Sequence, residues 1–481
     1  MEGVAVLDAG TTSTRALVFD ARGKVAAGAA LELALRTPTP GRAEQDPREI
    51  EAKSRRVLRR ALAEARRRGV RVRALGLTNQ RETFLLWEPG GRPRTRAVVW
   101  QDRRSAGFCA AMPSRRREWV RRRSGLPVDP YFSATKLALL LRDADLRRDA
   151  RRGRLRFGTV DAWLLDRLAG LHATEPSNGS RTLLLNLRTR RWDHGLLDLF
   201  GVPEDLLPEV RPSTGPFGEV GGVPVAAVLG DQQASLFGHG CWRPGEAECT
   251  YGTGAFLLAN TGPKPKPVPG LAASVAWERP GRPAYCLEAS IFTAGDALRW
   301  LRDNVGLLEA AGQSERVARQ VPDSGEVLFV PALSGLGAPH WDPEARGALL
   351  GLSRATARGQ IVRAVLEGVA HRVADGAEVM GRAVPLRSLR AGGGGSRNAL
   401  WMQMQADILG VPVLRSAEAE ATALGVGLLA GLEAGMWDAG EARNRVRAER
   451  GFRPRRGFPR ARERARWRRA LEVVRAWRGD G

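Results

Sequence analysis

A turn rich in hydroxyl side chains follows the first apolar run of the chain, in "LDAGTTSTRALVFD" (residues 7–20). Asp8 ends the apolar run, and Gly10 gives the backbone the freedom to turn tightly. The groups that could face an anion are the hydroxyls and N–H groups of Thr11, Thr12, Ser13 and Thr14 and the guanidinium of Arg15. We interpret this segment as a phosphate-binding turn in which Asp8 holds Mg²⁺ through water, with a plain polar β-turn as the alternative.

Two further glycine-rich turns occur in the second half of the chain. "TYGTGAF" (250–256) places Thr253 between two glycines, and "AGGGGSRNALWMQMQADILG" (391–410) has four consecutive glycines before a helical pattern. The glycines at 392–395 permit close approach of a flat ligand such as adenine, and Ser396 is of a type that caps helices. A hairpin turn and a flexible linker are the alternatives. Phosphate-type turns in both halves together predict a nucleotide held between them.

A single carboxylate, Asp231, stands in "VAAVLGDQQASLFGHG" (225–240) between an apolar run and a helix-like run. The local sequence favours a helix cap, because Asp is a common N-cap residue. The family resemblance carried by other motifs of the chain implies a second role, that of the general base that deprotonates an acceptor hydroxyl. We predict both roles, and we expect the helix N-terminus to favour the anionic form of Asp231.

The elements that would position these residues form two related α/β halves. The first half begins with strand, Gly/Thr turn and strand, followed by a helix at 47–68 and a strand at 72–78. A similar order begins again after residue 245, and further helices are predicted at 293–304, 356–380 and 397–409. Gly and Pro in "GHGCWRPGE" mark a boundary near 240–245, which predicts domains at 1–243 and 244–481.

Length and composition indicate a globular protein. The 481 residues suffice for two substantial domains, and a hydrophobic content of 43% excludes disorder throughout. No apolar run approaches the roughly 20 residues that a membrane span needs. The first residues lack the basic start and cleavage site of a signal peptide, and none of the four cysteines forms a CxxC pair. We therefore expect a cytoplasmic protein.

The net charge of +24 suggests nucleic acid as a partner, but arginine usage offers another explanation. Only five of the 76 basic residues are lysine, which is typical of a codon bias or a heat adaptation. The densest basic run, "RGFRPRRGFPRARERARWRR" (450–469), could bind an acidic partner, although a solvated helix face is the preferred reading. We predict no membrane partner and no specific nucleic-acid partner.

The chain resembles the FGGY carbohydrate kinases along nearly its full length. The motifs that carry the resemblance are "DAGTTSTRALVFD", "GLTNQRET", "VVWQDRR", "DPYFSATK", "GTVDAWLL", "SRTLLLNL", "GDQQASLFG", "TYGTGAFLL", "GLGAPHWDPEARGALLGLSR" and "VLEGVAHR". They occur in family order, and "NQRET", "DPYF" and "GAPHWDPEARG" indicate the branch that acts on glycerol.

This resemblance implies an actin/hexokinase-type α/β fold, in which two RNase H-like domains enclose ATP and substrate in a cleft. It implies transfer of the γ-phosphoryl group of ATP to a terminal hydroxyl of glycerol, with Mg²⁺, in an enzyme that is often a homodimer or homotetramer. The glycerol-binding positions correspond to Arg81, Glu82, Trp100, Tyr131, Asp231, Gln232 and Phe256. The nucleotide-binding positions correspond to Thr11, Thr12, Ser13, Arg15, Thr253, Gly295, Arg299, Gly394 and Asn398, and Asp8 and Asp231 are assigned to the metal.

Some positions depart from the family pattern. Arg299 replaces a frequent Gln near the adenine, and Gly392 replaces a frequent Asp. Relatives have a longer loop before Asp231, which carries a fructose-1,6-bisphosphate site in some and a phosphorylatable histidine in others. This chain has only "GEVGGV" there, and no histidine lies between His194 and His239, so we expect it to lack both controls.

Other functions remain in competition with phosphorylation of glycerol. A kinase for another small polyol or ketose would share most motifs, although "QRET" argues against it. A non-catalytic, actin-like ATP-binding protein would not need Arg81, Glu82 and Asp231 together. A nucleic-acid-binding protein would bind random duplex with a steep dependence on salt.

Overall fold

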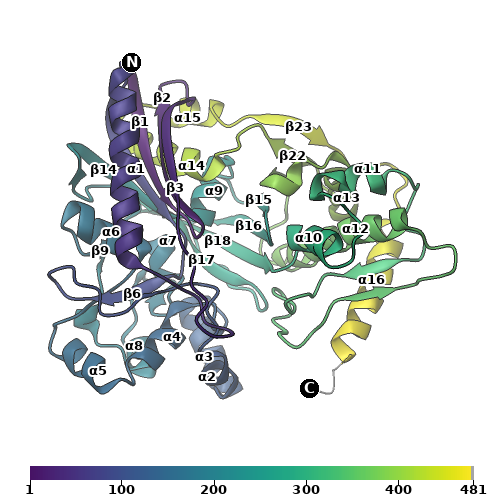
Figure 1. The fold of residues 1–481 in the computed structure, drawn as a ribbon, viewed down its shortest axis with the longest axis horizontal. Helices are drawn as coiled ribbons and strands as arrows, with labels where there is room; N and C mark the ends of the chain where they lie inside the picture. Colours follow the sequence, from purple (N-terminus) through teal and green to yellow (C-terminus); the bar gives the residue numbers. More distant parts are fainter. Residues whose placement is uncertain (478–481) are drawn as a thin grey trace.

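The computed structural model describes residues 1–477 as two α/β lobes that lie side by side (Figure 1). The purple and teal part of the chain forms one lobe, and most of the green and yellow part forms the other. One sheet of six strands organises the first lobe, and one sheet of seven strands organises the second.

The first sheet has the strand order β13-β14-β5-β1-β2-β3. Its strands are β1 (Glu2–Ala9), β2 (Ser13–Asp20), β3 (Val25–Glu32), β5 (Arg71–Asn79), β13 (Glu219–Val220) and β14 (Val223–Gly230). Alternate side chains of β1 point to opposite faces. Ala5 and Leu7 pack with α1 (Pro47–Arg67) and α6 (Val160–Ala169), whereas Val4 and Val6 pack with α9 (Asp231–Gly238) and α14 (Ala421–Glu433). Helices cover both faces, which is why these strands are nearly continuous apolar runs.

The second sheet has the order β17-β18-β16-β15-β21-β22-β23. Its strands are β15 (Glu246–Tyr251), β16 (Ala255–Gly262), β17 (Ala272–Arg279), β18 (Arg282–Ile291), β21 (Ser388–Gly392), β22 (Val413–Ser416) and β23 (Ala448–Phe452). Five of these strands, β18-β16-β15-β21-β22, follow the same third-second-first-fourth-fifth order as β3-β2-β1-β5-β14 in the first sheet. The expected repeat of an α/β unit is therefore present.

The long helices begin and end close to the predicted bounds. At the start of α1, the Asp46 side chain accepts a hydrogen bond from the Arg48 N–H. Pro47 is the first helical residue, as the Asp-Pro pair predicts. The helices of the second lobe are α10 (Gly295–Asp303), α11 (Ser314–Ala318), α12 (Arg358–Met380), α13 (Ala399–Leu409) and α16 (Arg460–Ala476), whereas α15 (Ala439–Asn444) lies beside α14 on the first lobe (Figure 1).

Helix α14 belongs to the second half of the sequence but packs on the first sheet, against β1, β5 and β14. Its Leu424 and Leu428 lie in one hydrophobic cluster with Phe237 of α9 and with Trp277 and Cys286 of the second sheet. The two lobes therefore share part of their hydrophobic core.

A helical layer extends the first lobe below its sheet (Figure 1). Its elements are β4 (Glu44–Gln45), β6 (Phe84–Trp87), β7 (Ala97–Val98), α2 (Ala106–Ala110), α3 (Ser114–Ser124), α4 (Ser133–Leu140), α5 (Ala144–Arg151), β8 (Arg156–Thr159) and α8 (His194–Phe200). The short connecting elements are β9 (Ala173–Thr174), α7 (Pro176–Gly179), β10 (Leu185–Asn186), β11 (Arg191–Trp192), η1 (Glu204–Leu206), β12 (Glu209–Val210), η2 (Ala311–Gln313), β19 (Leu328–Val330), β20 (Ala348–Leu350) and η3 (Gly394–Arg397).

The basic C-terminal stretch is more deeply packed than its composition suggests. Helix α16 carries hydrophilic residues, but Trp467 is fully buried and Arg464 is only 4% exposed. Arg464 Nη2 pairs with Asp375 Oδ1 of α12 at 2.6 Å. The expected solvated helix face is present, since Arg462, Arg468 and Arg469 are exposed, and the opposite face of the helix docks into the second lobe through a buried ion pair and a tryptophan.

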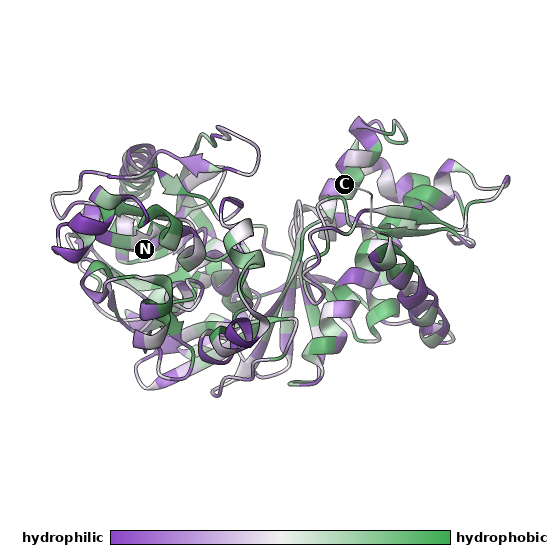
Figure 2. Ribbon diagram, turned by 90° about the horizontal axis from the view of Figure 1, so that it is seen from below, coloured by the Kyte–Doolittle hydropathy of each residue, from purple (hydrophilic) through white to green (hydrophobic). Residues whose placement is uncertain are grey.

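Figure 2 shows hydrophobic residues concentrated along the strands and inner helices of both lobes, with hydrophilic residues on the outer helices and loops. Across residues 1–477, no helix has both the length and the apolar character to cross a membrane.

Candidate active site

The first Gly/Thr turn joins β1 to β2. Gly10 N–H donates to Ser13 O over 2.9 Å, which closes the turn. Asp8 and Arg15 face each other across the strand pair, and Arg15 Nε donates to Asp8 Oδ2 over 2.8 Å. Glu420, the residue before α14, forms a second ion pair with Arg15. The charge of Arg15 is therefore already paired with two carboxylates, so the N–H groups and hydroxyls of the turn are the groups left to meet an anion.

Thr11 connects this turn to the predicted acceptor site. Its Oγ1 accepts from Trp100 Nε1 over 3.0 Å and donates to Gln80 Oε1 over 3.1 Å. Gln80 Nε2 also donates to Gly10 O over 3.1 Å. Thr12, at the tip, is exposed. A shift of the turn would therefore change the hydrogen bond between Thr11 and Trp100.

The second Gly/Thr turn, Gly252–Gly254, packs against the start of α10. Gly295 N–H donates to Gly252 O over 3.0 Å, and a Cβ on Gly295 would lie 2.5 Å from that oxygen, so glycine is required there. Arg299 Nη2 donates to Thr253 Oγ1 over 3.1 Å. The structure thus brings together three residues predicted to bind the nucleotide: Thr253, Gly295 and Arg299.

The third glycine-rich turn ends at the N-terminus of α13. The cap of this helix is Asn398, whose side chain accepts from Trp401 N–H over 2.9 Å, and not Ser396 as predicted. Ser396 instead donates to Gly393 O over 2.7 Å, and Gly393 has a φ of +77° that favours glycine. Gly394 begins η3. Because β21 pairs in parallel with β15, this turn lies at the same edge of the sheet as Gly252–Gly254.

The predicted acceptor residue Arg81 lies at the centre of a buried polar cluster. Its Nη1 donates to Glu288 Oε2 over 2.6 Å and to Gln233 Oε1 over 3.2 Å, and its Nη2 donates to Tyr131 OH over 3.5 Å. Its Nε lies 3.2 Å from Asp231 Oδ1. The side chain of Arg81 is 2% exposed, which excludes a surface ion pair.

Glu82, the next residue, has a strained backbone with a φ of +61°, which is uncommon for any residue except glycine. Its carbonyl oxygen accepts from Ser133 Oγ over 2.8 Å, and its Oε1 accepts from Arg181 Nε over 2.5 Å. Such a conformation costs on the order of 1–3 kcal/mol and persists where the surroundings fix it, often at active sites. This backbone conformation places the side chains of Glu82 and Arg81 in the same buried polar cluster.

Aromatic residues flank this cluster. The rings of Trp100 and Tyr131 meet edge to face with centroids 5.7 Å apart, and Trp100 remains partly exposed. Burial raises the pKa of Tyr131, so its hydroxyl stays protonated. Phe256 lies half-buried on β16, directly opposite Ser290 of β18. The first lobe thus supplies Trp100 and Tyr131, and the second lobe supplies Phe256.

Asp231 is the first residue of α9, and the cap position belongs to Gly230. The predicted capping role is therefore wrong. Among the described residues, the hydrogen-bond donor to Asp231 Oδ1 is the adjacent Gln232 N–H, over 2.7 Å, and Arg81 Nε forms an ion pair with the same oxygen. Although 29% of its side chain is exposed, loss of hydration raises its pKa to about 7, against the lowering effect of Arg81. Burial outweighs the helix N-terminus, contrary to expectation, and yields a carboxylate that can gain or lose a proton near neutrality.

The two glutamines after Asp231 differ in their surroundings. Gln233 is fully buried and contacts Arg81, whereas the buried Oε1 of Gln232 has no hydrogen-bond partner among the described residues. An unpartnered buried amide oxygen is free to accept a hydrogen bond from a ligand hydroxyl. Sequence reasoning named Gln232 and missed Gln233, because nothing in the local pattern separates them.

The sequence also failed to identify Arg181 and Glu288. Arg181 lies in the "SRTLLLNL" motif, and Glu288 is the single charged residue in the apolar run "AYCLEASIF". A lone carboxylate in a buried strand is a signal that could have indicated a paired functional group.

The carboxylates offer a partial metal site. Asp8 and Asp231 are close enough for Asp8 to raise the pKa of Asp231. Within residues 1–477, no group of three or more His, Cys, Asp or Glu side chains is arranged to hold a metal ion by itself. This arrangement fits Mg²⁺, which commonly takes one or two carboxylates and completes its shell with water and substrate phosphates.

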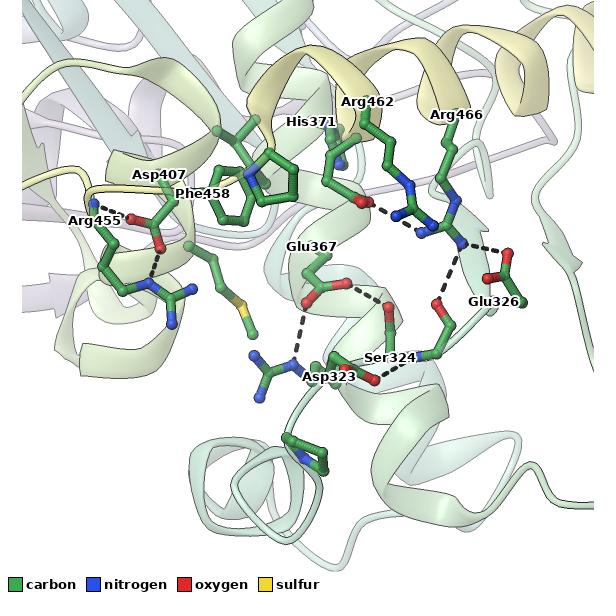
Figure 3. Close-up of a pocket in the computed structure, with 17 residues that line it drawn as sticks. Asp323, Ser324, Glu326, Glu367, His371, Asp407, Arg455, Phe458, Arg462 and Arg466 are labelled. Carbon is green, nitrogen blue, oxygen red and sulfur yellow. Dashed lines mark hydrogen bonds and ion pairs between the residues drawn. The ribbon is translucent and has the colours of Figure 1, made fainter.

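A separate cavity of about 360 Å³ lies between α12, α13 and α16 (Figure 3). Its charged side chains largely satisfy one another: Arg363 pairs with Glu367 at 3.1 Å and Arg455 pairs with Asp407 at 2.8 Å. Ser324 Oγ donates to Glu367 over 2.6 Å. Most of these charged groups are therefore already paired, and Arg462 is the charged lining residue without a described side-chain hydrogen bond or ion pair.

Comparison with known proteins agrees with this fold. The model of the FGGY carbohydrate kinase N-terminal domain matches residues 4–238, and that of the C-terminal domain matches residues 247–434. The chain is 49% identical to glycerol kinase of Thermus brockianus over 100% of both chains, and 48% identical to that of Gloeobacter violaceus over 90% of this chain and 88% of the relative.

Solved structures show the same fold. The structure of Plasmodium falciparum glycerol kinase with ADP superposes with a TM-score of 0.93 at 30% identity, over 98% of each chain. A xylulose kinase from Lactobacillus acidophilus superposes with a TM-score of 0.90 at 21% identity, over 99% of this chain and 98% of that one. The predicted two-domain α/β kinase fold with an active-site cleft is confirmed. The chain belongs to the FGGY family of carbohydrate kinases.

Proposed function

We propose that this protein transfers the γ-phosphoryl group of ATP to a terminal hydroxyl of glycerol, giving sn-glycerol 3-phosphate and ADP. The observation that carries the proposal is the buried cluster of Arg81, Glu82 and Tyr131 directly beside Asp231. A small triol needs rigid donors and acceptors, and this cluster offers a guanidinium, a carboxylate and a phenol. Glycerol kinases that are 44–49% identical to this chain support the same substrate.

Asp231 acts as the general base. One carboxylate oxygen accepts the proton of the attacking hydroxyl while the hydroxyl oxygen bonds to the γ-phosphorus and the bond to the β,γ-bridging oxygen breaks. Such transfers depend mainly on positioning and charge neutralisation. Arg81, Glu82 and Gln232 orient the glycerol hydroxyls, and Trp100, Tyr131 and Phe256 line its carbon chain. Closure of the lobes would exclude water and so prevent hydrolysis of ATP.

The nucleotide contacts come from both lobes. The Thr11–Ser13 turn and Thr253 face the phosphates, with Arg15 behind the first turn, while Gly295, Arg299, Gly394 and Asn398 border the adenosine. Mg²⁺, held by Asp8 and Asp231 through water, would neutralise charge on the phosphates.

The domain division at 1–243 and 244–481 is part of the proposal. The connection between α9 and β15 crosses this boundary, and the two family models meet on either side of it. We also propose a cytoplasmic enzyme that forms a homodimer or homotetramer.

Consumption of ATP in the presence of glycerol tests the function. The assay compares glycerol with xylulose, erythritol, dihydroxyacetone and no acceptor. We expect ADP to form fastest with glycerol. Equal rates with and without glycerol would overturn the proposal, and a faster rate with xylulose would indicate a ketose kinase.

The rate is expected to depend on the protonation of Asp231. Only the carboxylate can accept a proton, so kcat/KM for glycerol should rise with pH as Asp231 loses its proton, with a midpoint near its pKa of about 7. The measurement is a pH profile at saturating ATP. A flat profile between about pH 5 and about pH 8 would contradict the role of Asp231 as base.

Replacement of Arg299 by alanine is expected to weaken nucleotide binding. The variant loses the hydrogen bond from Nη2 to Thr253 Oγ1, so the KM for ATP should rise by about three- to tenfold while the KM for glycerol stays unchanged. Arg302→Ala on the same helix is the matched control, because Arg302 pairs only with the exposed Asp303 among the described contacts. An unchanged KM for ATP in Arg299→Ala would remove Arg299 from the nucleotide site.

The short segment before Asp231 is expected to make the enzyme insensitive to fructose-1,6-bisphosphate. "GEVGGV" forms a tight hairpin between β13 and β14, in which Gly221 and Gly222 have φ angles of +63° and +76°. A two-residue turn leaves no side chains to surround a bisphosphate. Activity should stay constant at physiological concentrations of the sugar phosphate. Inhibition there would show that control persists without the longer loop.

A further inference from the structure

Glu288 lies on the face of the second sheet that meets the first lobe. Its neighbours along β18, Leu287 and Ala289, belong to the core of the second lobe, so Glu288 points the other way. On the paired strands it lies opposite Leu258 and Ala272. The side chain is fully buried, and a buried carboxylate persists only with close partners.

Both arginine partners of Glu288 come from the first lobe. Its Oε2 accepts from Arg81 Nη1 over 2.6 Å, and its Oε1 accepts from Arg181 Nη2 over 3.1 Å. Ser290 of the same strand donates to Oε1 over 2.8 Å. Burial alone would raise the pKa of Glu288, but Arg181 and Arg81 lower it to about 2, so it is ionised at neutral pH.

Arg181 extends this contact to Glu82. Its Nε donates to Glu82 Oε1 over 2.5 Å, and its guanidinium lies over the Tyr131 ring, 5.4 Å from the centroid. Four charges therefore alternate in one buried row: Arg81, Glu288, Arg181 and Glu82. Glu288 is bonded directly to Arg81 and reaches Glu82 through a single side chain, and both of these residues are proposed to bind glycerol.

Glu288 also competes with Asp231 for Arg81. The Nη1 edge of the guanidinium faces Glu288 at 2.6 Å, while its Nε lies at the longer distance of 3.2 Å from Asp231 Oδ1. Without the Glu288 charge, Glu82 and Asp231 would be the remaining carboxylates near Arg81. A closer pair with Asp231 would turn the guanidinium away from the acceptor.

We propose that Glu288 is a positioning residue for phosphoryl transfer, which holds Arg81 and, through Arg181, Glu82 in the geometry that binds the acceptor and keeps Arg81 from closing onto Asp231. This role rests on the proposed function. It also makes the acceptor site depend on the contact between the lobes, because the second lobe supplies the anion that fixes Arg81.

Replacement of Glu288 by glutamine tests this role in the full-length protein. We expect kcat/KM for glycerol to fall by about a hundredfold, since a small misplacement of a binding group has that effect, while the KM for ATP changes by less than about threefold.

Glu248→Gln is the matched control. Glu248 lies on the same face of the second sheet and is equally buried, but burial raises its pKa to about 8, so it is largely uncharged. No described hydrogen bond or ion pair joins it to Arg81 or Arg181. We expect Glu248→Gln to keep its kinetic constants within about threefold of the starting protein.

If Glu288→Gln does not fold, the variant Glu288→Asp tests the same role. It keeps the charge but shortens the side chain, so it should recover part of the lost kcat/KM. Normal kcat/KM in Glu288→Gln, or equal losses for glycerol and ATP, would overturn the positioning role. If the starting protein itself fails to phosphorylate glycerol, the proposed function fails instead.

Discussion

Replacement of Asp231 by asparagine is expected to lower kcat by about 10³- to 10⁴-fold, which is the contribution typical of a general base. Asparagine keeps the size of the side chain but cannot accept the proton of the attacking hydroxyl. Arg81 retains Glu288 and Gln233 as partners, so the fold and the acceptor site should persist. Steady-state rates and equilibrium binding of ATP measure the two effects separately, and ATP affinity should stay nearly intact.

The control for Asp231→Asn is Asp198→Asn, which alters an exposed carboxylate on α8. It should leave kcat, ATP binding and the thermal midpoint unchanged. Near-normal turnover in Asp231→Asn would remove Asp231 from the role of base. Loss of ATP binding together with turnover would instead place Asp231 mainly in the metal and nucleotide site.

Replacement of Arg81 by alanine is expected to raise the KM for glycerol by about a hundredfold or more, because hydrogen bonds from a charged group contribute about 1.5–3 kcal/mol each. The KM for ATP should change far less. The variant also leaves Glu288 with one arginine, and removal of one member of a buried ion pair costs about 3–5 kcal/mol, so the thermal midpoint should fall.

Arg81→Lys separates binding from stability. Lysine keeps the positive charge, but its single ammonium group cannot reach Glu288, Gln233 and Tyr131 at once as the guanidinium does. It should recover stability more than affinity for glycerol. Arg73→Ala on β5, the strand that precedes Arg81, is the control, because the one side-chain partner of Arg73 among the described residues is the half-exposed Glu2. Equal rises in both KM values would contradict a direct contact between Arg81 and glycerol.

The sequence by itself determined the fold class and the elements that carry the candidate site. Strand–turn–strand units, the Asp-Pro start of α1 and the periodic apolar runs are local signals, and the structure places these elements within a few residues of the predicted bounds. The three glycine-rich turns were also identified, because a tight turn demands particular residues at particular positions. Resemblance to the family, rather than these patterns, supplied the roles of Arg81, Glu82 and Tyr131.

Only the tertiary structure decided how the site residues are paired and charged. Arg81 and Glu288 are 207 positions apart in the sequence, and Glu82 and Arg181 are 99 apart, so no local pattern could indicate their contacts. The raised pKa of Asp231 and the paired state of Arg15 likewise depend on burial and on carboxylates brought in by other elements. The physical reason is that spacing along a chain specifies turns and helix faces, whereas desolvation and ion pairing arise only when distant segments exclude water together.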